Sequence, residues 1–122
     1  FVTVVMAVCD AAAHVDAALR AVADQTYPAE SYEIVVAVGP SRDDTAARVR
    51  RAAAVDRRMR VVANPAGTAS AGLNLAAAVA RGSTIVRIDA RTIVARDYIE
   101  QCVDALARSG ADNVGGVMHA TG

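Results

Sequence analysis

The sequence predicts an α/β fold in which one mostly parallel sheet carries helices on both faces. Two patterns along the 122 residues indicate this class. Short β-branched runs alternate with longer segments of helical periodicity, and the first of these runs is apolar throughout. Strands buried on both faces have such uninterrupted runs, and a helix between successive strands connects parallel neighbours. The length fits a single domain.

Five short runs are predicted strands because they are rich in β-branched residues and end at turn-forming residues. The first, VTVVMAV, is the longest, and the second ends at Gly39-Pro40. In chain order the five runs are residues 2–8, 33–38, 60–63, 84–88 and 113–118.

Four segments between these runs are predicted helices, most clearly where apolar residues recur three and four positions apart. Ser41 and Asp44 fit a capping box before the second helix, and Ser70 is the predicted cap of the third. The helices cover residues 12–24, residues 45–55, a segment from Ser70 to Gly82, and a segment that contains Ile99 and Leu106 and stops at Gly110.

Composition excludes several classes of function. Thirteen basic and 13 acidic residues leave no net charge to attract nucleic acid, and the absence of lysine excludes chemistry that needs that side chain. No apolar stretch approaches the ~18 residues of a membrane-spanning helix. Cys9 and Cys102 lack metal-ligand spacing, so free thiols in a reducing cytoplasm are expected.

Ligands of parallel sheets bind outside the carboxyl ends of the strands, which directs attention to the residues after each predicted strand. The first strand is followed by Cys9-Asp10-Ala11-Ala12, without the glycines of a dinucleotide-binding turn, and no P-loop sequence occurs. Asp89 ends the fourth strand. Its carboxylate suits Mg²⁺ or Mn²⁺ bridging to phosphates, and capping of the next helix is the alternative interpretation.

Eight segments of the chain carry a recognisable pattern in their order and spacing: residues 2–8 with Asp10, 24–28, 33–36, 41–45, Asn64-Pro65, Leu73-Asn74, 82–92 and 110–117. Together they resemble family 2 glycosyltransferases, which have the GT-A fold, and the resemblance covers essentially the whole chain. Residues 82–92 and 110–117 resemble most the succinoglycan-type glucosyltransferase branch, which acts in bacterial exopolysaccharide assembly.

The resemblance implies that residues 1–122 are the N-terminal, donor-binding half of an inverting enzyme. The enzyme would move a hexose, glucose from UDP-glucose in the nearest branch, to a saccharide or lipid-linked acceptor. The implied donor site contains the loop Ala7, Val8, Cys9 and Asp10, the turn Val38, Gly39 and Ser41, the helix residue Asn74, and the D-x-D positions Asp89, Ala90 and Arg91, with Asp89 as ligand of Mn²⁺ or Mg²⁺.

Three residues, at two places in the chain, depart from the family pattern. Val38 and Gly39 stand where acidic residues usually follow the second strand, which removes a carboxylate acceptor for the base N–H. Arg91 stands where Asp or His usually completes the D-x-D motif. A guanidinium group cannot ligate a cation, but it can pair with the diphosphate through its fork of donors.

The family's general base and acceptor-side motif are expected beyond Gly122, so this segment is expected to bind donor without turnover. The alternative is a nucleotide-sugar-binding module without catalysis. We expect a cytoplasmic location, at the inner face of the cell membrane through other parts of a longer parent. The sheet edge and acceptor-side face left uncovered favour self-association.

Three further polar residues have two open interpretations each. Asp43 either contacts the nucleotide or caps the second helix, and Asn74 either contacts the donor or makes a structural hydrogen bond. His119 either touches substrate or is a loop residue.

Overall fold

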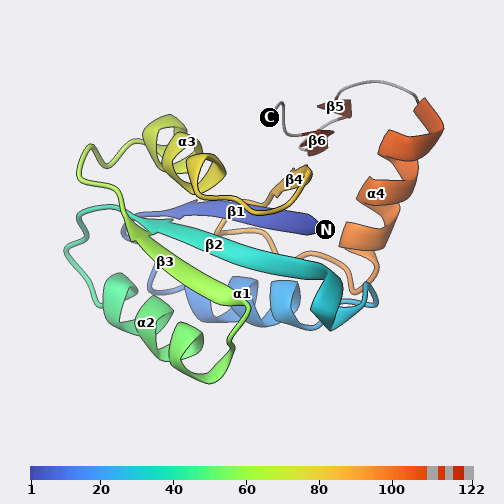
Figure 1. Ribbon diagram of the computed structural model, residues 1–122. Helices are drawn as coiled ribbons and strands as arrows, with labels where there is room; N and C mark the ends of the chain where they lie inside the picture. The colour runs from blue at the N-terminus through green and yellow to red at the C-terminus, as the bar shows by residue number, and fades with distance from the viewer. Residues whose placement is uncertain (110–112, 115–116, 120–122) are drawn as a thin grey trace.

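The computed structural model describes residues 1–109, 113–114 and 117–119. Strands and helices alternate along the chain as predicted (Figure 1). In chain order the elements are β1 (Val2–Val8), α1 (Val15–Ala23), the 3-10 turn η1 (Ala29–Ser31), β2 (Tyr32–Val38), α2 (Thr45–Val55), β3 (Met59–Ala63), α3 (Ala69–Ala78), β4 (Thr84–Arg87), α4 (Tyr98–Ser109), β5 (Asn113–Val114) and β6 (Val117–His119).

The strands form one sheet in the order β3-β2-β1-β4-β6-β5. β3, β2, β1 and β4 are parallel, whereas β6 is antiparallel to β4 and β5 is antiparallel to β6. The single strand predicted over residues 113–118 is therefore wrong. Residues 113–114 and 117–119 form two antiparallel strands in which Val114 pairs with Val117; residues 115–116 lie outside the described residues.

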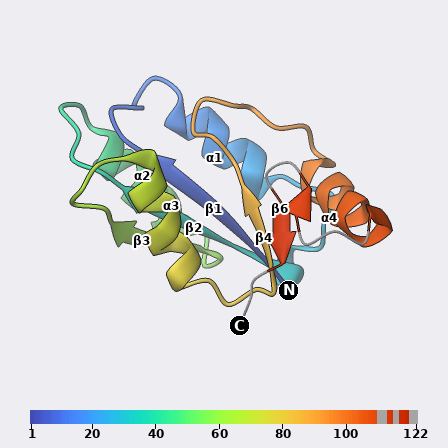
Figure 2. The same ribbon diagram turned by 90° about the horizontal axis from the view of Figure 1, so that it is seen from above.

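Helices cover both faces of the sheet, which confirms the predicted fold class. Alternate residues of β1 and β2 pack with α1, α2 and α4 on one face, and α3 packs on the other (Figure 1). On its face α3 contacts β1, β2 and β3, and β4 and β6 lie to one side of it (Figure 2). None of the described helices has the length and apolar character that a membrane crossing requires.

Two predicted helix caps are wrong. The N-cap of α3 is Thr68, whose hydroxyl oxygen accepts a hydrogen bond from Ala71 N–H at 3.3 Å, while Ser70 lies inside the helix. α2 begins at Thr45, as predicted, but its N-cap is Asp44 and Ser41 lies outside the helix. α3 ends at Ala78 rather than Gly82, and the stop predicted at Gly110 lies outside the described residues.

Asp43 has a structural role near the start of α2. Its carboxylate accepts hydrogen bonds from the N–H of Thr45 at 3.0 Å and the N–H of Ala12 at 3.2 Å, and from the Thr45 hydroxyl. The hydrogen bond from the Thr45 hydroxyl is the main reason why the pKa of Asp43 lies below its ordinary value. These contacts join the loop after β1 to α2 and favour the structural interpretation of this residue.

Candidate functional site

The sheet has a topological switch point between β1 and β4. After β1 the chain moves to β2 and β3 on one side, and it returns to β4 on the other side of β1. In parallel sheets a crevice opens at the carboxyl ends of two such strands, because their connections leave in opposite directions. Strand order therefore predicts a ligand site between the carboxyl ends of β1 and β4.

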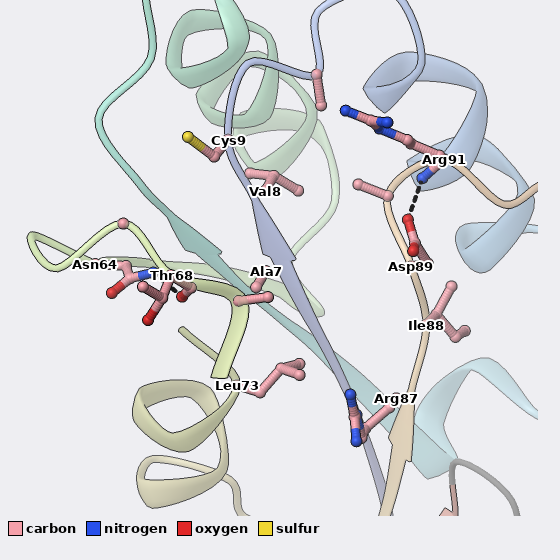
Figure 3. A pocket seen from close by; sticks show the side chains of 14 residues that line it. Ala7, Val8, Cys9, Asn64, Thr68, Leu73, Arg87, Ile88, Asp89 and Arg91 are labelled. Carbon is pink, nitrogen blue, oxygen red and sulfur yellow. Dashed lines mark hydrogen bonds between the residues drawn. The ribbon is translucent and has the colours of Figure 1, made fainter. Parts of the chain in front are cut away.

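A pocket of about 500 Å³ lies at this point (Figure 3). Three segments far apart in the sequence supply its walls. They are the end of β1 with the following loop (Ala7, Val8, Cys9, Ala11), the β3–α3 connection with the first turns of α3 (Asn64, Gly67, Thr68, Ala69, Leu73), and the end of β4 with the following loop (Arg87, Ile88, Asp89, Ala90, Arg91).

Six of the predicted donor-site residues therefore meet in one cavity. They come from both strands that flank the switch point: Ala7, Val8, Cys9, Asp89, Ala90 and Arg91. Whether these residues bind a donor remains a prediction, but the structure does bring them together.

Charged groups of the pocket all lie on the segment that ends β4. Asp89 accepts a hydrogen bond from Arg91 N–H at 2.8 Å through Oδ1, which turns the chain away from the strand. Arg87, Asp89 and Arg91 are exposed, and within the described part of the chain neither guanidinium group takes part in an ion pair. Two cations and one carboxylate leave the pocket lining with one unit of positive charge, which favours an anionic ligand.

Sequence analysis did not identify Arg87 as a site residue. Its register partner on β1 is Val5, which packs with Ile85 beneath α3. Side chains two residues apart on a strand share a face, so Arg87 projects on the same side as Ile85. The sequence does contain a signal for it, because Arg87 lies two residues before Asp89 and alternate residues of a strand share a face.

Asp10 and Ser41 support the pocket from outside its walls. Asp10 N–H donates to Ser41 Oγ at 3.0 Å, and the Asp10 carboxylate accepts from Arg42 N–H at 2.6 Å. Asp10 has a φ of 48°, in the left-handed region where aspartate is one of the few tolerated residues. These bonds fasten the loop after β1 to the turn after β2.

Val38, Gly39 and Ser41, predicted to face the nucleoside, line a neighbouring hollow of about 580 Å³. Gly39 is nevertheless close to the pocket, since a Cβ added there would lie 3.2 Å from Gly67 Cα and 3.5 Å from Cys9 Cβ. A side chain at this position would push the two loops apart. The glycine that replaces an acidic residue of the family thus has a packing role.

Asn74 is exposed on α3 and does not line the pocket. The asparagine that does line it is Asn64, which is 3% exposed. Asn64 Nδ2 donates to the Thr68 carbonyl oxygen at 2.9 Å, while Oδ1 has no hydrogen-bond partner among the described residues. Asn64 therefore holds the loop before α3 in the shape that walls the pocket.

A glycine lets α3 approach the sheet beside the pocket. A Cβ at Gly72 would lie 2.8 Å from Asn64 Nδ2 and 2.9 Å from Ala7 Cβ, both too short for ordinary contact. Small residues at positions 7 and 72 therefore set the distance between α3 and β1.

The described residues do not fit a divalent cation held by the D-x-D positions. Asp89 supplies one carboxylate, and its Oδ1 is occupied by Arg91 N–H. A guanidinium group stands at the second ligand position. Across the described residues no group of three His, Cys, Asp or Glu side chains is arranged to hold a metal.

The parallel sheet, its switch point and the pocket beside it define an α/β domain of the GT-A type. The family model described as "Glycosyl transferase family 2" matches residues 3–122 of the chain. The chain belongs to the family 2 glycosyltransferases.

A relative extends the comparison. The succinoglycan biosynthesis protein ExoA of Rhizobium meliloti (strain 1021) is 34% identical over 113 residues, which are 91% of this chain and 34% of that protein. The chain thus spans about a third of the length of this relative.

Solved structures show the same fold. A mannosyltransferase of Pyrobaculum calidifontis, in complex with GDP-Man and Mn²⁺, has a TM-score of 0.78 at 32% identity, over 87% of this chain and 32% of that one. Residues 1–349 of S. aureus TarS, in complex with UDP-GlcNAc, have a TM-score of 0.77 at 18% identity, over 91% of this chain and 32% of that one.

Proposed function

We propose that the chain binds a nucleoside diphosphate sugar, UDP-linked, in the pocket between the ends of β1 and β4. The observation that carries this proposal is the pair of guanidinium groups beside Asp89 at the switch point of the sheet. Family membership and the nucleotide-sugar complexes of similar structures support it.

In the proposed complex the small and apolar wall residues of β1 and α3 lie against the nucleoside. Ala7, Val8 and Leu73 leave room for a flat base and a ribose, and the carboxylate of Asp89 can accept a hydrogen bond from a ribose hydroxyl. The diphosphate lies beside the arginines. Each ligand group thus faces wall chemistry that suits it.

We propose that the parent enzyme transfers a hexose, glucose, with inversion. The acceptor hydroxyl oxygen forms a bond to sugar C1 as the bond from C1 to the diphosphate oxygen breaks, and a base takes the hydroxyl proton. The family resemblance puts that base beyond Gly122, so we propose that this segment supplies donor binding without turnover. The acceptor is a saccharide or a lipid-linked saccharide of exopolysaccharide or cell-envelope glycan synthesis, as the name of the 34% identical relative suggests.

A location in the cytoplasm, at the inner face of the membrane through other parts of the parent, suits such an acceptor and is part of the proposal. We also propose that the segment self-associates at high concentration, because β3 is an edge strand of the sheet and exposes Val61. A monomer in sedimentation at high concentration would contradict that part.

A second candidate is a nucleotide-sugar-binding module without catalysis. Val38 and Arg91 favour it, since these residues replace acidic or ligating residues that the family usually has. Transfer of labelled sugar by the full-length parent to a membrane-extracted acceptor, with the product linkage determined by NMR, separates the two candidates. Donor binding without any transfer would favour the module.

Calorimetric titration of this chain with UDP, UDP-glucose, UDP-GlcNAc, GDP-mannose and ATP tests the donor proposal. The expected result is saturable binding of the UDP compounds and weaker binding of ATP. Leu73→Asp puts a negative charge into the wall and should weaken UDP binding about tenfold or more.

The matched control is Leu75→Asp on the same helix, because Leu75 is exposed and lies outside the pocket lining. Equal effects of the two substitutions, or no nucleotide binding in the folded chain, would overturn the donor proposal.

A further inference from the structure

The pocket contains an unusual balance of charge for a site that the family fold associates with a divalent cation. Its lining holds the guanidinium groups of Arg87 and Arg91 and the single carboxylate of Asp89. In Figure 3 the two arginines extend from opposite ends of the 87–91 segment, with Asp89 between them. One unit of positive charge therefore remains before any ligand enters.

Asp89 lies two residues from each arginine, yet the described chain shows no ion pair between them. Elsewhere Arg48, Arg58 and Arg60 each pair with a carboxylate. The guanidinium donors of the pocket are thus free to face a ligand. A guanidinium group keeps its proton at any physiological pH and presents donors in the geometry of phosphate oxygens.

A divalent cation at Asp89 would share the pocket with these two guanidinium groups. Like charges in one pocket repel each other. The same repulsion is absent if the diphosphate itself neutralises the arginines. The side chains present therefore favour an anion in direct contact over a metal bridge.

We propose that Arg87 and Arg91 bind the diphosphate of the donor directly, so that donor binding requires no divalent cation. This inference rests on the proposed function of the pocket. Arg91 takes the place of the metal ligand at the D-x-D position, and Arg87 supplies the second cation from the end of β4. Asp89 remains as an acceptor for a hydroxyl group of the donor.

Calorimetric titration of the chain with UDP and UDP-glucose, in EDTA and again in excess Mn²⁺, tests the inference. The expected dissociation constants agree within about threefold between the two conditions. Arg87→Gln and Arg91→Gln should each weaken binding about tenfold, since each removes charge-assisted hydrogen bonds to phosphate. Arg57→Gln is the matched control, because Arg57 is exposed and lies just before β3, an edge strand, whereas the pocket lies at the carboxyl ends of β1 and β4.

A charge reversal gives the sharpest contrast. Arg91→Asp restores a second carboxylate near Asp89 and removes a cation, so this variant should bind UDP only when Mn²⁺ is present. Thermal unfolding of each variant confirms that it is folded.

Binding by the unmodified chain that requires Mn²⁺, or binding that neither arginine substitution weakens, would overturn the inference and leave the proposed function standing. Binding weakened by Arg91→Gln alone would overturn the role of Arg87. Failure to bind any nucleotide in both conditions would overturn the proposed function, and the inference with it.

Discussion

Glu33 anchors the chain that leaves α3 to the amino-terminal ends of the central strands. It is 5% exposed on β2, and its carboxylate accepts hydrogen bonds from Thr3 Oγ1 at 2.7 Å and from Arg81 N–H at 2.7 Å. Arg60 pairs with the other carboxylate oxygen at 2.9 Å. Thr3 Oγ1 in turn accepts from Gly82 N–H at 2.9 Å, so one carboxylate organises the start of the β4 segment.

Glu33→Gln is the informative perturbation because it keeps the shape and removes the charge. The new amide oxygen can still accept from Thr3 and Arg81, but the amide NH₂ then faces the Arg60 guanidinium, and two donors oppose each other. Loss of one charge-assisted interaction at a buried site costs about 2 kcal/mol. For a domain of this size, that loss lowers the melting temperature by roughly 6–10 °C.

The loss depends on pH in a defined direction. Burial by itself raises the pKa of Glu33, but hydrogen bonds from Arg81 N–H, Thr3 and Arg60 outweigh it and bring the pKa below the ordinary 4.5. A carboxyl group with a lowered folded-state pKa stabilises the fold above its unfolded-state pKa, and this contribution disappears as pH falls through the folded-state value. The difference in the free energy of unfolding between the native chain and Glu33→Gln should be largest at neutral pH and should disappear in acid.

Urea unfolding of both chains at neutral pH and at several acidic pH values measures this difference in unfolding free energy. Glu30→Gln is the control, since Glu30 is exposed in the turn before β2 and should change stability little at any pH. A difference in unfolding free energy below about 0.5 kcal/mol at neutral pH, or a difference that stays unchanged in acid, would refute this account of Glu33.

Three further outcomes are expected. Gly72→Ala should cost about 2 kcal/mol in urea unfolding and weaken UDP binding, because the added methyl group collides with Ala7; an unchanged midpoint would contradict this packing. Tyr32→Phe should cost about 1 kcal/mol, since the hydroxyl donates to a carbonyl at the end of α1, and a melting curve identical to the native one would exclude the bond. Burial raises the pKa of Cys102, so iodoacetamide should modify the exposed Cys9 first at neutral pH, as peptide mass spectrometry would record.

The strands could be predicted because their signal is local. Residues 4–8 and 34–38 are uniformly apolar, and short runs of this kind are typical of strands that are buried on both faces. The caps could not be predicted as well, since Thr68 and Ser70 are equally able to cap a helix. The choice depends on where the chain turns before the helix, and in the structure it turns at Gly67, which has a φ of 78°.

The site was predictable where it follows from strand ends. Asp89 was predicted because ligand sites lie at the carboxyl ends of parallel strands, and Arg91 was predicted from the resemblance to the family's D-x-D motif; both line the pocket. Arg87 was missed because it belongs to the strand itself, and Asn64 because its part in the wall depends on burial against α3. The hairpin of β5 and β6 was missed because two short strands and one longer strand have similar composition.

The central claim is that the pocket between β1 and β4 binds a nucleoside diphosphate sugar. Amide chemical-shift mapping of the isotope-labelled chain during titration with UDP-glucose tests it most directly. The account predicts that the largest shifts fall in residues 7–11, 64–73 and 87–91, the three segments that wall the pocket. Shifts confined to the hollow between α1 and α2, around Asp16 and Arg51, or no shifts at saturating ligand, would contradict it.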